Sequence, residues 1–263
     1  DFEAVFEAAE SGRADRALIP IENTLHGSVH ENYDLLREHD LEIVAESHLR
    51  IRHRLLSVGG ASLASIRTVT SHPQALGQCR AFLRTRLPDA TIVPSYDTAG
   101  AARGVARSGD PSMAAIAGRR AADEYGLITL AEDIESNHNN FTRFLTLARP
   151  GTAAPPRDET PTGGERPFKT SIVYAQRDNV PGSLFKSLAV FALRDIDLYK
   201  IESRPLVGSP GQYIFYLDLQ GSRDDEPVRR ALAHLDEVAA SVKVLGTYVA
   251  APVEWAGDGA GNG

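Results

Sequence analysis

The stretch RTVTSHPQALGQCRAFLRTRL, residues 67–87, combines a short strand pattern with a helix pattern that follows it directly. Ser71 is the predicted N-cap of the helix and Pro73 falls in its first turn, where proline is well tolerated. The helix has one apolar stripe, formed by Leu76, Cys79, Leu83 and Leu87. The stretch therefore predicts one strand–helix unit of an α/β fold.

The same scheme recurs twice after this stretch. TIVPSYDTAGAARGVAR (91–107) predicts a strand, a cap at Asp97 or Thr98 and an alanine-rich helix, and MAAIAGRRAADEYGL (113–127) repeats the scheme. Before them, apolar residues occupy most odd positions from Leu41 to Ile51, which predicts a half-buried strand or a bent pair of strands. Strands alternating with helices indicate an α/β architecture with largely parallel strand pairing.

The chain changes character after a segment rich in proline and glycine. RPGTAAPPRDETPTGGERP (149–167) has the composition of a linker. The following region predicts a strand at 169–175, a helix at 181–195, strands at 197–205 and 212–220, a helix at 226–240 and a strand at 242–249. This βαββαβ order indicates a ferredoxin-like module. The predicted domains are 1–149, a linker at 150–167, a module at 168–252 and a flexible tail at 253–263.

Composition excludes several classes of function. The 263 residues carry a formal net charge of −7, so a general nucleic-acid surface is not expected. Cys79 is the single cysteine, which leaves neither a disulfide framework nor a cysteine-based metal site. There is no long apolar run and no signal-peptide pattern, so we expect no membrane association and a cytoplasmic location.

Four polar clusters follow predicted strands in the first domain: PIENTLHGS (20–28), SHPQAL (71–76), YDTAGAA (96–102) and NNFTRF (139–144). In α/β folds ligands bind at such strand ends, and helix N-termini there could hold carboxylates. Capping alone also explains Ser71, Asp97 and Thr98, and a simple turn also explains Glu22 and Asn23. Known nucleotide-binding and nucleophile motifs are missing, and no carboxylate joins His26 and His30 in a metal set. The sequence thus predicts a site without metal or cofactor.

Several motifs together resemble the prephenate dehydratase family of phenylalanine biosynthesis. They are PIENTLHGS, SHPQALGQC, AAIAGRRAADEYGL followed by NNFTRFL, then GSLFKSLAVF and KIESRP, in this order between about Ala17 and Ala250. The resemblance implies a catalytic domain of two α/β subdomains, like a type II periplasmic-binding protein, followed by a C-terminal ACT domain. It also implies a carbon–oxygen lyase that converts prephenate to phenylpyruvate, CO2 and water. Arogenate as the substrate, or a non-catalytic ligand sensor, remain the alternatives.

The resemblance also implies roles for particular residues. Thr142 of the Thr-Arg-Phe motif is the expected catalytic residue, donating a proton or hydrogen bond to the departing hydroxyl. Strand alternation makes Arg143 face away from Thr142, so Arg143 is either a substrate ligand or a structural residue. The other candidate substrate-binding residues are Glu22, Asn23, Thr24, Ser71, Gln74, Thr98 and Phe144.

For regulation, the resemblance implies a phenylalanine site between paired ACT domains, and hence a homodimer or homotetramer. The implied site residues are Val180, Pro181, Gly182, Ser183, Leu184, Glu202, Ser203, Arg204 and Pro205. Ser183 departs from the family's Gly-Ala-Leu motif, in which alanine takes this position. The family's first strand and its Gly-rich loop have no counterpart in the residues given, and we expect that they were omitted rather than lost.

Overall fold

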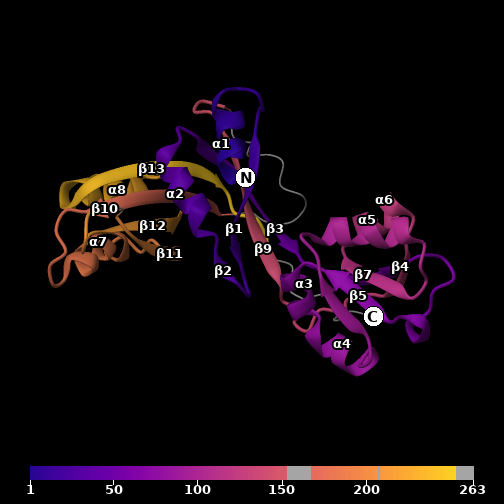
Figure 1. The fold of residues 1–263 in the computed structure, drawn as a ribbon. Coiled ribbons are helices and arrows are strands. Elements are labelled where there is room, and N and C mark those ends of the chain that lie inside the picture. The colour runs from indigo at the N-terminus through magenta and orange to yellow at the C-terminus, as the bar shows by residue number, and fades with distance from the viewer. Residues whose placement is uncertain (153–166, 207, 253–263) are drawn as a thin grey trace, which may run out of the picture. The chain divides into compact units, whose positions relative to one another are not determined.

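A computed structural model describes residues 1–152, 167–206 and 208–252. The chain forms two compact units. One contains Asp1–Leu49 and Thr142–Val253, and the other contains Arg50–Phe141. Most of the predicted linker at 150–167 and all of the predicted tail at 253–263 lie outside the described residues. The division therefore groups the first and last parts of the chain, and the segment between them forms a unit of its own (Figure 1).

The middle unit contains a five-stranded sheet in the order β6-β5-β7-β4-β8. Its strands are β4 (Arg54–Ser57), β5 (Thr68–Ser71), β6 (Thr91–Pro94), β7 (Met113–Ala117) and β8 (Ile128–Ala131). One apolar core packs α3 (Pro73–Gln78) and α4 (Arg80–Arg86) on the sheet, and a second packs α5 (Thr98–Ser108) and α6 (Arg119–Tyr125). A short 3-10 helix, Leu63–Ser65, precedes β5. The alternating strand–helix pattern is confirmed.

Three details of this unit differ from the prediction. Only the pairs β5–β6 and β5–β7 are parallel, whereas β4 pairs antiparallel with β7 and β8, so the sheet is mixed. The helix predicted over 71–87 breaks at Cys79, which separates α3 from α4. Its N-cap is His72 and not Ser71, because His72 Nδ1 accepts the backbone N–H of Gln74 while Ser71 stays in the strand. Cys79 is fully buried, as predicted for a core residue.

The other unit contains two four-stranded sheets. The first has the order β2-β1-β9-β3 and consists of β1 (Ala17–Asn23), β2 (Gly27–Ser28), β3 (Glu42–Arg50) and β9 (Phe141–Ala148). The helices α1 (Phe2–Glu10) and α2 (His30–Glu38) pack on it. The alternation predicted for β3 is wrong in its second half: the odd residues Ser47 and Leu49 are exposed, and Glu46 is buried by partners from distant parts of the chain.

The second sheet has the order β11-β12-β10-β13. Along the chain it runs β10 (Phe168–Gln176), α7 (Ser183–Ala192), β11 (Leu198–Pro205), β12 (Tyr213–Gln220), α8 (Glu226–Val238) and β13 (Ala239–Val249). The predicted βαββαβ order is confirmed. All of its pairings are antiparallel, as in a ferredoxin-like module.

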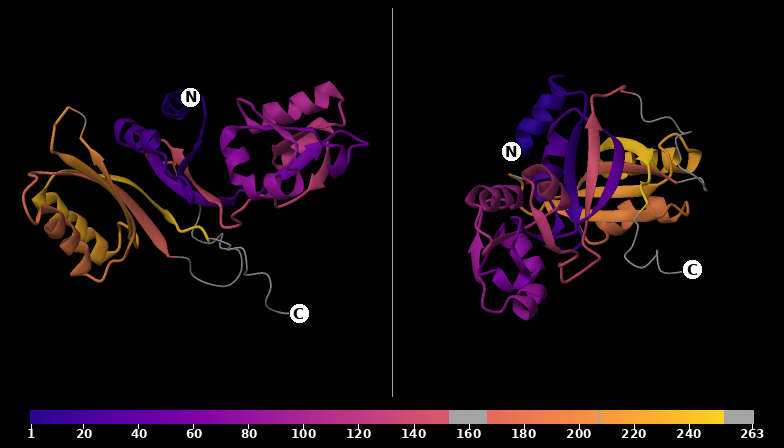
Figure 2. Two further views of the ribbon diagram at one scale, coloured as in Figure 1. Left: turned by 60° about the horizontal axis from the view of Figure 1, so that its bottom comes forward. Right: turned by 90° about the vertical axis from the view of Figure 1, so that its right-hand side faces the viewer.

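The second sheet is covered on both faces except along its edge strand β11, where alternate residues are exposed. Figure 2 shows α7 and α8 against one face, where they form a core with residues such as Ile172 and Leu217. The other face contributes Val173, Tyr216 and Tyr248 to a core shared with α1, α2 and the first sheet. Gly246 of β13 lies so close to β3 that a Cβ atom there would overlap the backbone of Ile43. The C-terminal module is thus packed directly on the first part of the chain.

None of the described helices is long and apolar enough to cross a membrane. Within the described residues, no group of three or more histidine, cysteine or acidic side chains is arranged to hold a metal ion.

Candidate functional site

Antiparallel pairing brings two of the predicted motifs side by side. In the register of β1 and β9, Asn23 lies opposite Thr142, and Glu22 lies opposite Arg143. The register shifts at Ile21, where a bulge follows Pro20, a residue that has no N–H to donate. Motifs that are about 120 residues apart in the sequence therefore meet at the end of one sheet.

The short hairpin between β1 and β2 holds the first motif in place. Its turn ends at Gly27, whose positive φ of 78° is a conformation that glycine adopts without strain. The buried side chain of Asn32 on α2 donates a hydrogen bond of 2.7 Å to the carbonyl oxygen of Pro20. The turn at Gly27 and the hydrogen bond from Asn32 together fix the path of the backbone on either side of Glu22 and Asn23.

Asn23 hydrogen-bonds directly to Thr142, the expected catalytic residue. Its Nδ2 donates to Thr142 Oγ1 at 3.1 Å. The opposite end of the amide is fixed, because Asn23 Oδ1 accepts the backbone N–H groups of Leu25 at 2.9 Å and His26 at 3.1 Å. The amide therefore presents its NH2 group to the threonine, and the threonine oxygen acts as an acceptor. This leaves the single Thr142 O–H to be donated to another group.

Alternate residues of β9 lie on opposite faces, as strand geometry requires. Phe141, Arg143 and Leu145 are buried, while Thr142 and Phe144 are partly accessible and share the other face. The prediction that Thr142 and Arg143 face opposite sides is confirmed. Phe144, another candidate residue, accordingly lies on the same face as Thr142.

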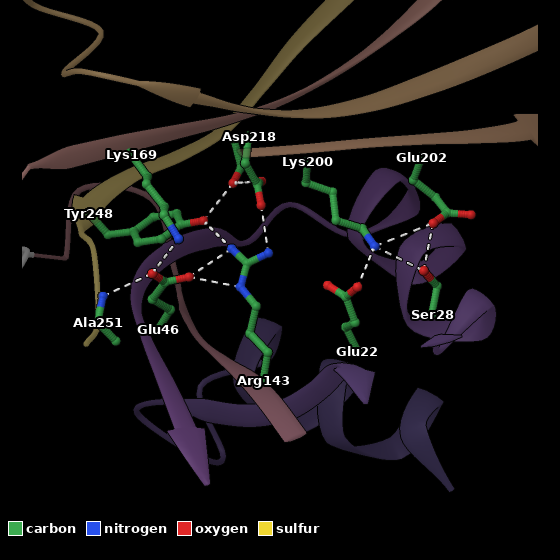
Figure 3. Close-up of polar contacts among 11 residues, drawn as sticks. Glu22, Ser28, Glu46, Arg143, Lys169, Lys200, Glu202, Asp218, Tyr248 and Ala251 are labelled. Carbon is green, nitrogen blue, oxygen red and sulfur yellow. Dashed lines mark hydrogen bonds and ion pairs between the residues drawn. The ribbon is translucent and has the colours of Figure 1, made fainter. Parts of the chain in front are cut away.

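The guanidinium of Arg143 is buried among partners from β3 and from the C-terminal module (Figure 3). It donates to Glu46 of β3 at 2.8 Å, to Asp218 of β12 at 2.6 Å and to Tyr248 of β13 at 3.0 Å. Burial disfavours its charge, but Asp218, Tyr248 and Glu46 together outweigh burial and raise the pKa of Arg143. The side chain is therefore a permanently charged link between β9 and the second sheet.

Further contacts extend this buried cluster. Lys169 Nζ donates to Glu46 at 2.8 Å, so Glu46 bridges two cations. Ser171 donates to Asp218 at 2.6 Å and lies 2.7 Å from the Tyr248 hydroxyl. Burial and the neighbouring Asp218 raise the pKa of Tyr248 well above its ordinary value, so the phenol stays neutral. Two cations and two carboxylates balance within the cluster, which makes its burial tolerable.

A second polar cluster joins the hairpin to β11 (Figure 3). Lys200 Nζ lies 3.1 Å from Glu22, 3.1 Å from the hydroxyl of Ser28 and 3.5 Å from Glu202. Ser28 in turn donates to Glu202, and His30 lies 3.4 Å from the same carboxylate. Glu22, from the motif predicted to bind substrate, and Glu202, from the motif predicted to bind the effector, therefore belong to one polar cluster.

The residues predicted for the effector site point in two directions. Along β11 the even positions are partly buried and the odd ones exposed, so Glu202 and Arg204 face the first part of the chain. Arg204 pairs there with Asp34 of α2. Ser203 and Pro205 are on the exposed side. Val180 and Leu184 are exposed as well, and Gly182 caps α7 with a positive φ of 84°.

The remaining candidate residues lie in the middle unit. Ser71 ends β5, and Thr98 begins α5 just after β6, the parallel neighbour of β5. Gln74 is exposed in the first turn of α3, while Asp97 caps α5 by accepting the N–H of Gly100. Ser71 is fully buried, and its hydroxyl donates to the carbonyl of Ile116 at 2.6 Å. The sheet thus gathers these residues at one edge, but the only O–H of Ser71 is already used.

Sequence reasoning missed the partners of these motifs. Glu46 belonged to a predicted polar strand face, and Lys200, Asp218 and Tyr248 lay within predicted strands of the module. Their one common signal is a charged or hydroxyl side chain within a predicted strand. Such a signal shows that a side chain needs a partner but not which one.

Comparisons with known proteins agree on a family. A family model described as prephenate dehydratase matches residues 1–152. An Arabidopsis thaliana protein named arogenate dehydratase/prephenate dehydratase 2, chloroplastic, is 46% identical over 257 residues, which are 94% of this chain and 65% of that protein. The chain therefore spans about two thirds of the length of this curated relative.

Solved structures share the fold. A prephenate dehydratase from Arthrobacter aurescens in complex with L-Phe is 34% identical with a TM-score of 0.81, covering 97% of this chain and 82% of that one. A structure described as a novel type of quorum quenching acylase is 32% identical with a TM-score of 0.84, covering 96% and 88%.

Proposed function

The chain belongs to the prephenate dehydratase family, and we propose on this basis that it removes CO2 and water from prephenate or from arogenate. The product is phenylpyruvate from prephenate and phenylalanine from arogenate. The observation that carries the proposal is the Asn23–Thr142 hydrogen bond, which fixes a hydroxyl group and leaves its proton available. We do not propose the acylase activity in the name of one structural neighbour, because the Asn23–Thr142 hydrogen bond supports proton donation by Thr142.

The reaction needs little more than a placed proton donor and sites for the substrate's charges. As the bond between the ring and its carboxylate breaks, its electron pair enters the ring and the C–O bond to the ring hydroxyl breaks. CO2 departs, and the leaving oxygen takes a proton from Thr142 to become water. Solvent then returns a proton to Thr142. Formation of the aromatic ring supplies the driving force, so no cofactor is required in this scheme.

A threonine hydroxyl is a weak acid, so its contribution must come from placement. The Asn23 amide donates to the threonine oxygen, which stabilises negative charge on that oxygen as its proton moves away. The β-branched threonine side chain also has few rotamers, so its orientation is easily maintained. Thr142 is therefore the proposed proton donor, and Asn23 the residue that positions it.

We assign the remaining candidate residues to substrate binding according to their surroundings. Phe144 lies on β9 with Thr142, and Thr24 follows Asn23 in the turn between β1 and β2. Gln74 and Thr98 lie at the strand ends of the middle sheet, where hydroxyl, amide and backbone N–H groups can hold carboxylates. Glu22 and Arg143 have charged partners within the chain, so we propose structural roles for both side chains.

For regulation, we propose that the βαββαβ module is an ACT domain that binds phenylalanine with a second copy. The support is the resemblance of its two motifs and the exposed apolar residues around them, which are Val180, Leu184, Phe185, Tyr199 and Ile201. Such a patch suits burial against another chain. The name of the Arthrobacter aurescens structure records L-Phe bound to that relative. Sedimentation of the full chain with and without phenylalanine tests for a dimer or tetramer.

The substrate is decided by a direct assay. The full-length protein is incubated separately with prephenate and with arogenate, and phenylpyruvate and phenylalanine are quantified by chromatography. Turnover of either substrate supports the proposal, and the ratio of the two kcat/KM values names the preferred one. Binding of ligands without any product would support the sensor alternative instead. The cytoplasmic location stays a prediction, since the name of the Arabidopsis thaliana relative includes the word chloroplastic.

A further inference from the structure

We propose that Lys200 couples the phenylalanine site to the catalytic strand pair, acting as a bridge between Glu202 and Glu22. The inference rests on the proposed function and goes beyond it by naming the residue through which regulation reaches the site. The bridge is a direct contact: one ammonium group lies 3.1 Å from Glu22 and 3.5 Å from Glu202.

The surroundings of Lys200 favour a shared cation over a surface ion pair. Its side chain is only 13% exposed, and its ammonium lies over the ring of Tyr33 at 5.8 Å from the centroid. Tyr33 is itself buried and packs edge-to-face on Tyr216 of β12. Lys200 is thus confined to a space between two carboxylates, in which a change at one carboxylate alters the charge balance of the other.

At one end of the bridge lies the motif proposed to bind phenylalanine. Glu202 accepts from Ser28 and faces Lys200 and His30. Burial disfavours the charge of Glu202, yet these donors together lower its pKa, so the carboxylate is fully ionised near neutral pH. An amino-acid ligand whose ammonium approached Glu202 would compete with Lys200 for this carboxylate.

At the other end lies the strand that positions Thr142. Glu22 precedes Asn23 on β1, and Asn23 holds the Thr142 hydroxyl. If Lys200 moves toward Glu22 when Glu202 is engaged by ligand, the hairpin from Glu22 to Ser28 must adjust. The coupling then has a defined route from Glu202 through Lys200 and Glu22 to Asn23. For such a route to regulate, phenylalanine must bind one arrangement of the bridge better than the other.

The test compares Lys200→Met with wild type in the full chain. Met keeps the apolar stem and removes the charge, and Lys200→Arg keeps a cation that can reach both carboxylates. The control is Arg223→Met, since Arg223 of the same module pairs with Glu42 of β3 at 3.7 Å, away from both motifs. The ratio of turnover without phenylalanine to turnover at saturating phenylalanine is measured for each protein, and calorimetry follows phenylalanine binding.

We expect Lys200→Met to bind phenylalanine but to show a ratio within about twofold of one, against the roughly 5- to 150-fold range of ordinary allosteric coupling. Lys200→Arg should restore part of the effect, and Arg223→Met should behave like wild type. A wild-type ratio in Lys200→Met, an equal loss in the control, or loss of phenylalanine binding in Lys200→Met overturns the inference.

A second readout separates this inference from the proposed function. Hydrogen exchange of the peptide spanning Glu22–Ser28 is compared with and without phenylalanine. The ligand should change its exchange in wild type and leave it unchanged in Lys200→Met, whether or not the chain turns over prephenate. Absence of turnover with this exchange pattern would count against the proposed reaction alone. Turnover with no effect of phenylalanine on the hairpin in wild type would count against the bridge alone.

Discussion

At the scale of single residues, the two ends of the Asn23 amide have separate roles. Its oxygen accepts two backbone N–H groups that shape the turn, and its nitrogen donates to Thr142. Because the two roles use different atoms, a substitution of nearly the same size can separate them.

Asn23→Asp keeps the acceptor for the turn but faces Thr142 with a carboxylate oxygen. The threonine O–H would then donate to that oxygen instead of the substrate. We therefore expect kcat to fall by about 10- to 100-fold with KM little changed, the size of loss that misplacement of a reacting group causes. Steady-state kinetics on the preferred substrate measure this. A variant with wild-type kcat would show that the Asn23–Thr142 contact does not matter.

Arg143 belongs to the same motif but, in this structure, acts on stability. Removing one partner from a buried ion pair leaves the others uncompensated, so Arg143→Met should lower the free energy of unfolding by about 3–5 kcal/mol. Urea denaturation of Arg143→Met, of Asp218→Leu and of the double variant Arg143→Met/Asp218→Leu gives the coupling energy. If Arg143→Met instead unfolds at the wild-type urea concentration and raises KM, the residue binds substrate.

At the scale of elements, His39 links α1 to the segment between α2 and β3. Its ring nitrogens lie 2.8 Å from Glu10 and 3.1 Å from Glu3, and Glu10 also accepts the backbone N–H of Asp40. Burial alone would lower the pKa of His39, but these two carboxylates outweigh burial and raise it. The backbone N–H of Asp40 and the His39 ring lower the pKa of Glu10.

These shifts predict a pH dependence with a definite sign. A raised histidine pKa contributes stability that is fully present below the unfolded pKa and is lost as pH rises through the folded value. Wild type should therefore lose stability as the pH rises from the ordinary histidine value of about 6.5 through the raised pKa of His39, and His39→Gln should lose clearly less over the same interval. The melting temperature of both proteins across this interval measures the difference. Parallel pH profiles of the two proteins would contradict the assignment.

The sequence predicted helices and strands well where a segment shows a single hydrophobic periodicity, either that of a helix or that of a strand. The six elements of the C-terminal module were all found, because each is a clear strand or helix pattern bounded by turns. The direction of the strands in the middle unit was not predicted correctly. The direction of β4 depends on the course of the connection that leads to it, and that course depends on the whole sheet. The face of β3 was also missed, because Glu46 is buried by Lys169 and Arg143, more than ninety residues away in the chain.

The same distinction applies to the candidate site. Position at strand ends and the family resemblance selected Thr142, Asn23 and Glu22, and alternation placed Arg143 on the opposite face from Thr142. The partners Lys200, Asp218 and Tyr248 could not be found, because a contact between distant strands depends on the register in three dimensions. Ser71 was predicted to cap a helix because of its residue type. It is instead a buried strand residue whose hydroxyl donates to the carbonyl of Ile116.

At the scale of the whole molecule, the C-terminal module is not an appendage joined by a linker alone. Its sheet shares a core and two polar clusters with the first part of the chain, including both neighbours of the Asn23–Thr142 pair. In the proposed scheme, a ligand bound to this module acts on the strand pair that carries Asn23 and Thr142 through side chains already in contact. The proposed regulation through these side chains has a meaning only if Thr142 is the catalytic residue.

The most direct test of that claim is the single-turnover rate of product formation from the preferred substrate in wild type, Thr142→Ser and Thr142→Ala. Circular dichroism and melting temperature confirm that each variant is folded. Thr142→Ala should be slower by about 10²- to 10⁴-fold, the usual contribution of a placed proton donor, while Thr142→Ser should keep a rate well above it. A folded Thr142→Ala protein that forms product at nearly the wild-type rate would contradict the account.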